Sequence, residues 1–170
     1  SHITKDIDLV IYTGAHGGVE NIEVKTALEL GIRVLPHGKA LGLAMKGSTQ
    51  ISVAGSHGKT TTAAMIATIL NQGAYAIGCG EIRGLGLPGH DDGWPGSYFV
   101  AEADEYVTDP GHDKTPRFLW QTPHILVVTN IDFDHPDVYG SLEEVQQAFL
   151  ALQKQSSFCI VNIDDPASIP

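Results

Sequence analysis

The stretch Ile51-Ser-Val-Ala-Gly-Ser-His-Gly-Lys-Thr-Thr61 decides the fold, because an apolar β-type run passes through a glycine turn into a helix start. This arrangement is typical of a phosphate-binding loop. Glycines let backbone N–H groups approach phosphate oxygens, and the following helix points its positive end at them. Lys59 is placed to neutralise the β- and γ-phosphates of a nucleotide, and Thr60 to bind magnesium. The stretch therefore predicts nucleotide binding.

The spacing of this loop departs from the general phosphate-loop pattern. Gly55-x-x-Gly-Lys-Thr60 is shorter than Gly-x-x-x-x-Gly-Lys-Ser/Thr, because Val53 stands where the first glycine is expected. The alternative interpretation is an ordinary strand-to-helix turn rich in small residues. The strand before the loop and the apolar helix after it favour the nucleotide site. We expect Lys59 to point into that site rather than the core, so that Lys59→Ala leaves the fold intact.

Composition limits the class of protein. The chain has 170 residues, of which 42% are hydrophobic and 18% charged, which is enough for one packed domain or one domain and part of another. A formal charge of −10 argues against a general nucleic-acid surface, which needs Lys and Arg. Cys79 and Cys159 are too few for a disulfide framework or a four-ligand zinc site. With no signal peptide and no long apolar span in the sequence, we expect a cytoplasmic protein without membrane insertion.

Short β-rich runs alternate with helical stretches, which predicts an α/β fold with a mostly parallel sheet and flanking helices. The run Ile125-Leu-Val-Val-Thr129 is apolar as in a central buried strand. The expected strands are 8–13, 33–35, 50–54, 98–101, 124–129 and 157–162.

Helix boundaries can be read from capping residues. Asn21 is expected to begin a helix that Gly31 ends, and Ser141-Leu-Glu-Glu144 has the form of a capping box. The helix after Thr62 is expected to end near Gly73. Segments 78–96 and 108–116, rich in Gly, Pro and Asp, are expected to be long connections.

Two further groups of polar residues follow predicted strands. Glu102-Ala-Asp-Glu105 places three carboxylates after one strand, and Asn130 to Asp137 places an amide, His135 and more carboxylates after another. In open α/β sheets, ligands bind at this carboxyl edge, and magnesium takes oxygen ligands. The alternatives are a solvated acidic loop for the first group and a surface histidine for His135. Next to a phosphate loop we favour metal binding, with a metal or phosphate role for His135.

Taken together, these motifs resemble the central domain of the Mur ligases of peptidoglycan synthesis. They are Ala54-Gly-Ser-His-Gly-Lys-Thr-Thr-Thr62, Glu102-Ala-Asp-Glu105, and Thr129-Asn-Ile131 followed by Asp134-His-x-Asp137. The resemblance is greatest to the branch that acts on UDP-N-acetylmuramate. Residues 8–13, 21–24 and 30–35 are similar to the end of that branch's N-terminal domain. The resemblance thus implies that 1–46 is the last part of a Rossmann-like UDP-sugar-binding domain, and 47–170 a truncated P-loop-type ATP-binding domain without the C-terminal domain.

The resemblance implies an ATP-dependent ligase of cell wall biogenesis, supporting cell shape and division. ATP would phosphorylate the lactyl carboxylate of UDP-N-acetylmuramate, and an amino group would displace the phosphate to form an amide. Thr60 and Glu102 would bind a first Mg²⁺, and Glu102 and His135 a second, so that Lys59, Glu102 and His135 form the catalytic set. By position, the residues that would hold the nucleotide are Gly55, Ser56, His57, Gly58, Lys59, Thr60, Thr61 and Asn130.

Within this branch the acceptor is either L-alanine or a recycled L-alanyl peptide. Asp137 to Gly140 and Glu29 to Ile32 favour L-alanine, whereas Glu105-Tyr106, Asp113 to Leu119 and Phe133 to His135 favour the peptide. We favour L-alanine. A third hypothesis, of another class, is an isolated nucleotide-binding module without ligase activity. We expect this chain by itself to be inactive as a ligase.

Overall fold

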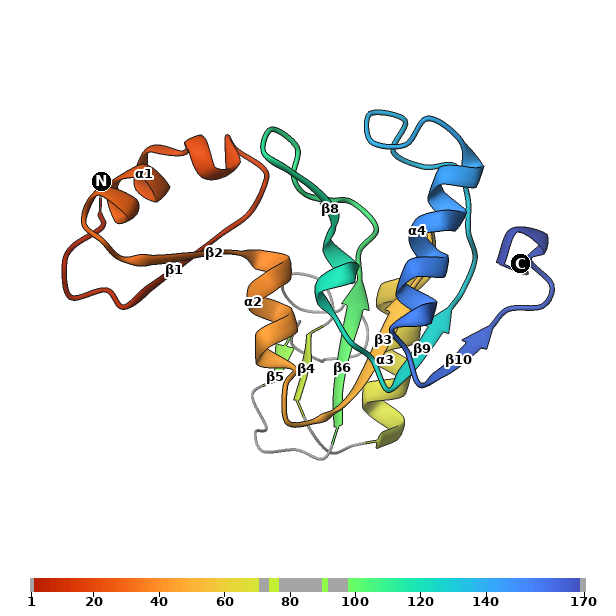
Figure 1. Ribbon diagram of the computed structural model, residues 1–170. Coiled ribbons are helices and arrows are strands. Elements are labelled where there is room, and N and C mark those ends of the chain that lie inside the picture. Colours follow the sequence, from red (N-terminus) through yellow and green to blue (C-terminus); the bar gives the residue numbers. More distant parts are fainter. Residues whose placement is uncertain (1, 71–73, 77–89, 92–97, 169–170) are drawn as a thin grey trace.

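A computed structural model describes residues 2–70, 74–76, 90–91 and 98–168 of the chain (Figure 1). Its strands are β1 (Leu9–Tyr12), β2 (Arg33–Pro36), β3 (Thr49–Ala54), β4 (Ala74–Ala76), β5 (His90–Asp91), β6 (Tyr98–Ala103), β7 (Val107–Asp109), β8 (Asp113–Pro116), β9 (Ile125–Val128) and β10 (Phe158–Val161). Its helices are α1 (Ile22–Glu29), α2 (His37–Ala44), α3 (Lys59–Leu70) and α4 (Leu142–Lys154), with short 3-10 helices η1 (Gly18–Glu20), η2 (Arg117–Trp120) and η3 (Pro166–Ser168).

The main sheet has six strands in the order β10-β9-β3-β6-β4-β5. All neighbours pair in parallel except β4 with β5. Strands β1 and β2 form a separate parallel pair, and β7 and β8 an antiparallel one. The predicted α/β class with a mostly parallel sheet is confirmed, and so are the six predicted strands. Strand β3 lies between β9 and β6 and is buried from Gln50 onward, so it is the central strand that positions the phosphate loop.

Helices α3 and α4 cover opposite faces of this sheet. Side chains alternate along a strand, and in β9 Leu126 and Val128 pack with Phe149 and Leu152 of α4. Ile125 and Val127 face the other way, into the cluster that contains Ala63 and Ala64 of α3. This alternation decides on which side of the sheet each residue at the strand ends lies.

The N-terminal unit, from β1 to α2, contacts two elements that follow β6. These elements are the hairpin β7-β8 and the 3-10 helix η2. Asp109 is buried, and its Oδ2 accepts a hydrogen bond from the Val19 N–H at 2.9 Å. Helix α2 packs on η2 so closely that a Cβ on Gly42 would lie 2.1 Å from the Trp120 carbonyl oxygen. In Figure 1 this unit, drawn red to orange, stands beside the sheet and continues into α2. The division between residues 46 and 47 stays a prediction.

Several local predictions can be compared with the structure. The Asn21 side chain accepts from Glu23 N at the start of α1, and Gly31 has φ +74° after its end, as expected. At α4, Ser141 caps Glu144 N–H, but the Glu144 carboxylate accepts from Gly140 N–H instead of Ser141 N–H.

One local prediction is wrong. Residues 108–116 are not a long irregular connection, because β7 and β8 pair through a tight turn there. Gly73 and nearly all of segment 78–96 lie outside the described residues. In the described part of the chain, no helix is long and apolar enough to cross a membrane.

Candidate active site

The phosphate loop runs from the end of β3 to the start of α3 and depends on two glycines. Gly55 has φ +139°, and a Cβ on it would lie 2.0 Å from Thr129 Oγ1, so no side chain fits. Gly58 has φ +82°, and a Cβ on it would meet no atom of the described residues within 4 Å, so its backbone conformation rather than lack of room requires glycine. The first N–H groups of a helix have no partner within the helix. The exposed Thr60 and Thr61 in the first turn of α3 therefore offer donors to an anion.

The residues that follow β9 hold this loop in place. Asn130 Nδ2 donates to the His57 carbonyl at 2.9 Å, and Asn130 Oδ1 accepts from His57 N–H at 3.0 Å. Thr129 Oγ1 donates to the same carbonyl at 2.6 Å. The Asn130 carbonyl accepts from Ser56 N–H at 3.1 Å. The sequence predicted that Asn130 lines the nucleotide site, and the structure gives it hydrogen bonds to the loop's backbone.

Lys59 forms an ion pair within the site. Its Nζ donates to the Gly55 carbonyl at 2.6 Å and lies 3.1 Å from Glu105 Oε2 and 3.4 Å from Oε1. The Glu105 side chain is only 3% exposed and that of Lys59 17% exposed. That Lys59 points into a phosphate site stays a prediction; in this structure its ammonium compensates a buried carboxylate.

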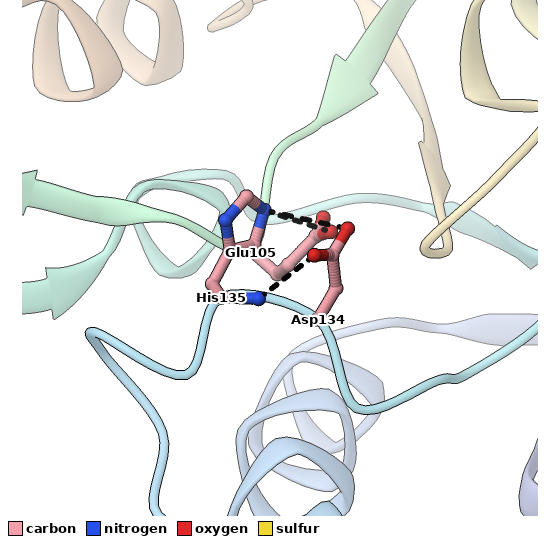
Figure 2. A group of neighbouring side chains, drawn as sticks. All are labelled: Glu105, Asp134 and His135. Carbon is pink, nitrogen blue, oxygen red and sulfur yellow. Dashed lines mark hydrogen bonds and ion pairs between the residues drawn. The ribbon is translucent and has the colours of Figure 1, made fainter.

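Glu105 also faces His135 and Asp134, as Figure 2 shows. His135 Nε2 lies 3.8 Å from Glu105 Oε1 and 3.9 Å from Asp134 Oδ2. One ligand atom from each of the three residues falls within 4.8 Å of the others, so the group could hold a metal ion. His135 has φ +59°, an uncommon conformation for a non-glycine residue. Its backbone N–H donates to Asp134 Oδ1 at 2.9 Å, which supports that conformation.

Aromatic residues fix the surroundings of this cluster. Tyr139 donates its O–H to the Glu105 carbonyl at 2.6 Å. Burial, followed by the negative charges of Glu105 and Asp104, raises the pKa of Tyr139, so this phenol remains a donor. Tyr106 packs edge-on against the His135 ring, with centroids 5.0 Å apart. These contacts hold Glu105 and His135 in a defined relation.

Glu102 lies within β6, on the face of the sheet that α3 covers. It pairs in register with Val53, and the alternation of β6 puts it on the same face as Val100, which packs against α3. Its Oε1 is buried and has no hydrogen-bond partner among the described residues. A buried carboxylate oxygen without a partner is costly unless a cation or donor compensates it. Glu102 is in register with Val53, which lies close to the end of β3 from which the phosphate loop starts. Its buried oxygen therefore fits a magnesium ligand, since hard cations take oxygen ligands.

The residues predicted for the site follow β3, β6 and β9, which are neighbours in the sheet and run parallel. Joint cation binding by Glu102 and His135 stays a prediction; in this structure the carboxylate nearest to the His135 ring is that of Glu105. The sequence marks Glu105 as one of three carboxylates and gives no functional signal for Thr129 or Tyr139. The signal that could have indicated a role for Glu105 in the site is its position two residues after the end of β6, at the edge of the sheet where ligands bind.

Comparisons with known proteins agree with this geometry. The family profile of the Mur ligase middle domain matches residues 53–169. UDP-N-acetylmuramate–L-alanine ligase of Chlorobium chlorochromatii is 38% identical over 155 residues, covering 90% of this chain and 31% of that protein. The enzyme of that name from Desulforamulus reducens is 38% identical over 173 aligned positions, covering 98% of this chain and 35% of the relative. The chain therefore spans about a third of the length of these relatives.

Solved structures give the same result. A UDP-N-acetylmuramate:L-alanyl-γ-D-glutamyl-meso-diaminopimelate ligase from Neisseria meningitides superposes with a TM-score of 0.73 at 28% identity, over 94% of this chain and 53% of that one. A UDP-N-acetylmuramate-alanine ligase from Thermotoga maritima gives a TM-score of 0.74 at 26% identity, over 96% and 37%.

Proposed function

Because this chain belongs to the Mur ligase family, we propose that it carries the ATP-binding centre of a ligase in peptidoglycan precursor synthesis. The substrate would be UDP-N-acetylmuramate and the acceptor L-alanine. The lactyl carboxylate attacks the γ-phosphorus of ATP and ADP leaves. The amino group of L-alanine then attacks the acyl carbon, loses a proton, and phosphate leaves. The product is an amide, made in the cytoplasm.

The observation that carries this proposal is the phosphate loop held against the loop after β9. Phosphoryl transfer depends mainly on positioning and on neutralising charge. Lys59 would neutralise phosphate oxygens, and the backbone of residues 55–61 would hold them. Mg²⁺, when bound, would add positive charge at the transferring phosphoryl group, with Thr60, Glu102 and His135 as its ligands. The Asn130 contacts to His57 fix the loop before nucleotide arrives.

The choice of acceptor is the finer part of the proposal. A ligase that attaches an L-alanyl peptide is the second candidate, supported by the 28% identical structure from Neisseria. The relatives at 38% identity support L-alanine. A binding module without ligase activity is the remaining alternative.

The test is ATP-dependent phosphate release by the intact protein with UDP-N-acetylmuramate and either L-alanine or L-alanyl-γ-D-glutamyl-meso-diaminopimelate. We expect release with L-alanine and a much lower kcat/KM with the tripeptide. The reverse order would assign the peptide ligase. If the protein binds ATP but releases phosphate with neither acceptor, the remaining interpretation is a nucleotide-binding module without ligase activity. The control is Lys59→Ala, which should abolish release in every case.

A further inference from the structure

The Lys59 ammonium, which would bind the nucleotide phosphates, already has hydrogen-bond acceptors around it in this structure. A lysine has three N–H donors. The acceptors around Lys59 Nζ are the Gly55 carbonyl at 2.6 Å and both carboxylate oxygens of Glu105, at 3.1 and 3.4 Å. A phosphate oxygen that binds Nζ therefore competes with these acceptors.

Glu105 is the acceptor that a phosphate would replace. The Gly55 carbonyl is neutral and belongs to the loop itself, whereas Glu105 carries a negative charge that would repel the incoming phosphates. Glu105 is nearly fully buried, and a buried carboxylate that loses its partner is strongly destabilised. Release of Lys59 therefore requires a second positive partner for Glu105.

A divalent cation held between Glu105, His135 and Asp134 would be such a partner. Oε1 of Glu105 already lies 3.8 Å from His135 Nε2, and Asp134 completes a group of three potential ligands of a cation. The Glu105 backbone is held by Tyr139, so only the side chain needs to turn. In Figure 2 the His135 ring points at the two carboxylates.

We propose that Glu105 is a positioning residue that occupies Lys59 in place of a nucleotide phosphate and moves to the His135–Asp134 side when nucleotide and a divalent cation bind together. This rests on the proposed function, because it presumes an ATP site at Lys59. The consequence is that the binding of ATP and the binding of the cation are coupled. Without the cation, ATP must displace a buried carboxylate that finds no other positive partner, so Glu105 makes ATP binding depend on magnesium.

The test compares dissociation constants for ATP in excess EDTA and in excess magnesium chloride, measured by calorimetry on the intact protein. Glu105→Gln keeps the shape but removes the charge. We expect it to bind ATP in EDTA about tenfold more tightly than wild type, and the ratio of the two constants to fall by about the same factor. A purely structural defect would raise both dissociation constants by the same factor and leave their ratio unchanged.

The matched control is Asp104→Asn. Asp104 is the neighbouring carboxylate, and its Oδ2 accepts from Arg117 at 2.7 Å instead of from Lys59. Its ratio should stay within about twofold of wild type. An equal fall in both variants would overturn the proposal, because it would mark a general effect of charge at this edge. An unchanged ratio in Glu105→Gln would overturn it as well.

A measurement on the wild-type protein covers the case in which Glu105→Gln does not fold. In a crystal structure with ATP analogue and magnesium, the Lys59 Nζ to Glu105 distance should exceed about 4 Å, the limit for an ion pair. An ion pair that persists beside bound phosphate would overturn the proposal. Wild-type protein that binds no ATP in magnesium would overturn the nucleotide site itself, and this inference with it.

Discussion

The side-chain amide of Asn130 binds both backbone groups of His57, donating to the carbonyl at 2.9 Å and accepting from the N–H at 3.0 Å. These residues are far apart in sequence, and the contact sets the shape of the phosphate loop. Asn130→Ala should weaken ATP binding by up to about thirtyfold, because two hydrogen bonds of about 1 kcal/mol each are lost from an exposed loop. Titration calorimetry would measure this.

The control for Asn130 is Asn162→Ala, which removes a comparable turn contact, from Asp164 N–H, at the end of β10. Its ATP affinity should equal that of wild type. Unchanged affinity in Asn130→Ala would show that the loop keeps its shape without this contact.

Gly55→Ala should destabilise the protein much more than Gly31→Ala. Both glycines have positive φ, but a Cβ at Gly55 would meet Thr129 Oγ1 at 2.0 Å, whereas a Cβ at Gly31 would meet no atom of the described residues within 4 Å. The strain of positive φ alone costs about 1–2 kcal/mol, which is what we expect for Gly31→Ala. Urea unfolding of both variants would check the order, and equal losses would contradict the packing of β3 on the loop after β9.

Lys59→Ala should lower the free energy of unfolding by about 3 kcal/mol, because it leaves the buried Glu105 carboxylate without a partner. Lys59→Ala combined with Glu105→Gln should regain much of that loss, while neither variant binds ATP well. The control, Lys25→Ala, breaks an exposed ion pair with Glu20 and should change stability by less than about 1 kcal/mol. If Lys59→Ala melts like wild type, the ion pair contributes nothing to the fold.

Glu102→Gln and His135→Asn should both raise the magnesium concentration needed for half-maximal turnover, with the larger effect for Glu102. Its Oε1 is buried and has no hydrogen-bond partner within the described part of the chain, so a cation there would be its main compensation. Asparagine at 135 tolerates the positive φ and so removes the imidazole without added backbone strain. Turnover against magnesium at saturating ATP is the measurement. If both variants need the same magnesium concentration as wild type, neither Glu102 nor His135 is a magnesium ligand.

His37 should make stability fall as the solution becomes acidic. Burial and then the positive charge of Arg117 lower the pKa of His37 from 6.5, against an opposing effect of Asp104. The unfolded chain therefore binds a proton that the folded chain resists, and stability is lost as the pH falls below about 6.5. His37→Gln should lose less stability than wild type between about pH 7 and pH 5.5. His16→Asn, at an exposed histidine, should follow wild type.

The local structure followed from residues close together in the sequence. The run before Gly55, the alternation along the strands, and the caps at Asn21 and Ser141 each depend on neighbours within a few positions, which is why these elements could be predicted. The hairpin at 107–116 was missed because Gly, Pro and Asp mark turns without telling whether the flanking residues pair. Pairing depends on partners that the local composition does not show.

The sequence by itself determined the α/β class, the phosphate loop and the inventory of carboxylates and histidine at the strand ends. The tertiary structure alone decided which of them meet. Glu102 and Glu105 differ by three positions, so the alternation of β6 and the turn after it send Glu102 to the face of α3 and Glu105 to Lys59 and His135. The sequence shows which functional groups follow each strand and are therefore available at one edge of the sheet. The direction of each side chain is fixed by packing on both faces of the sheet.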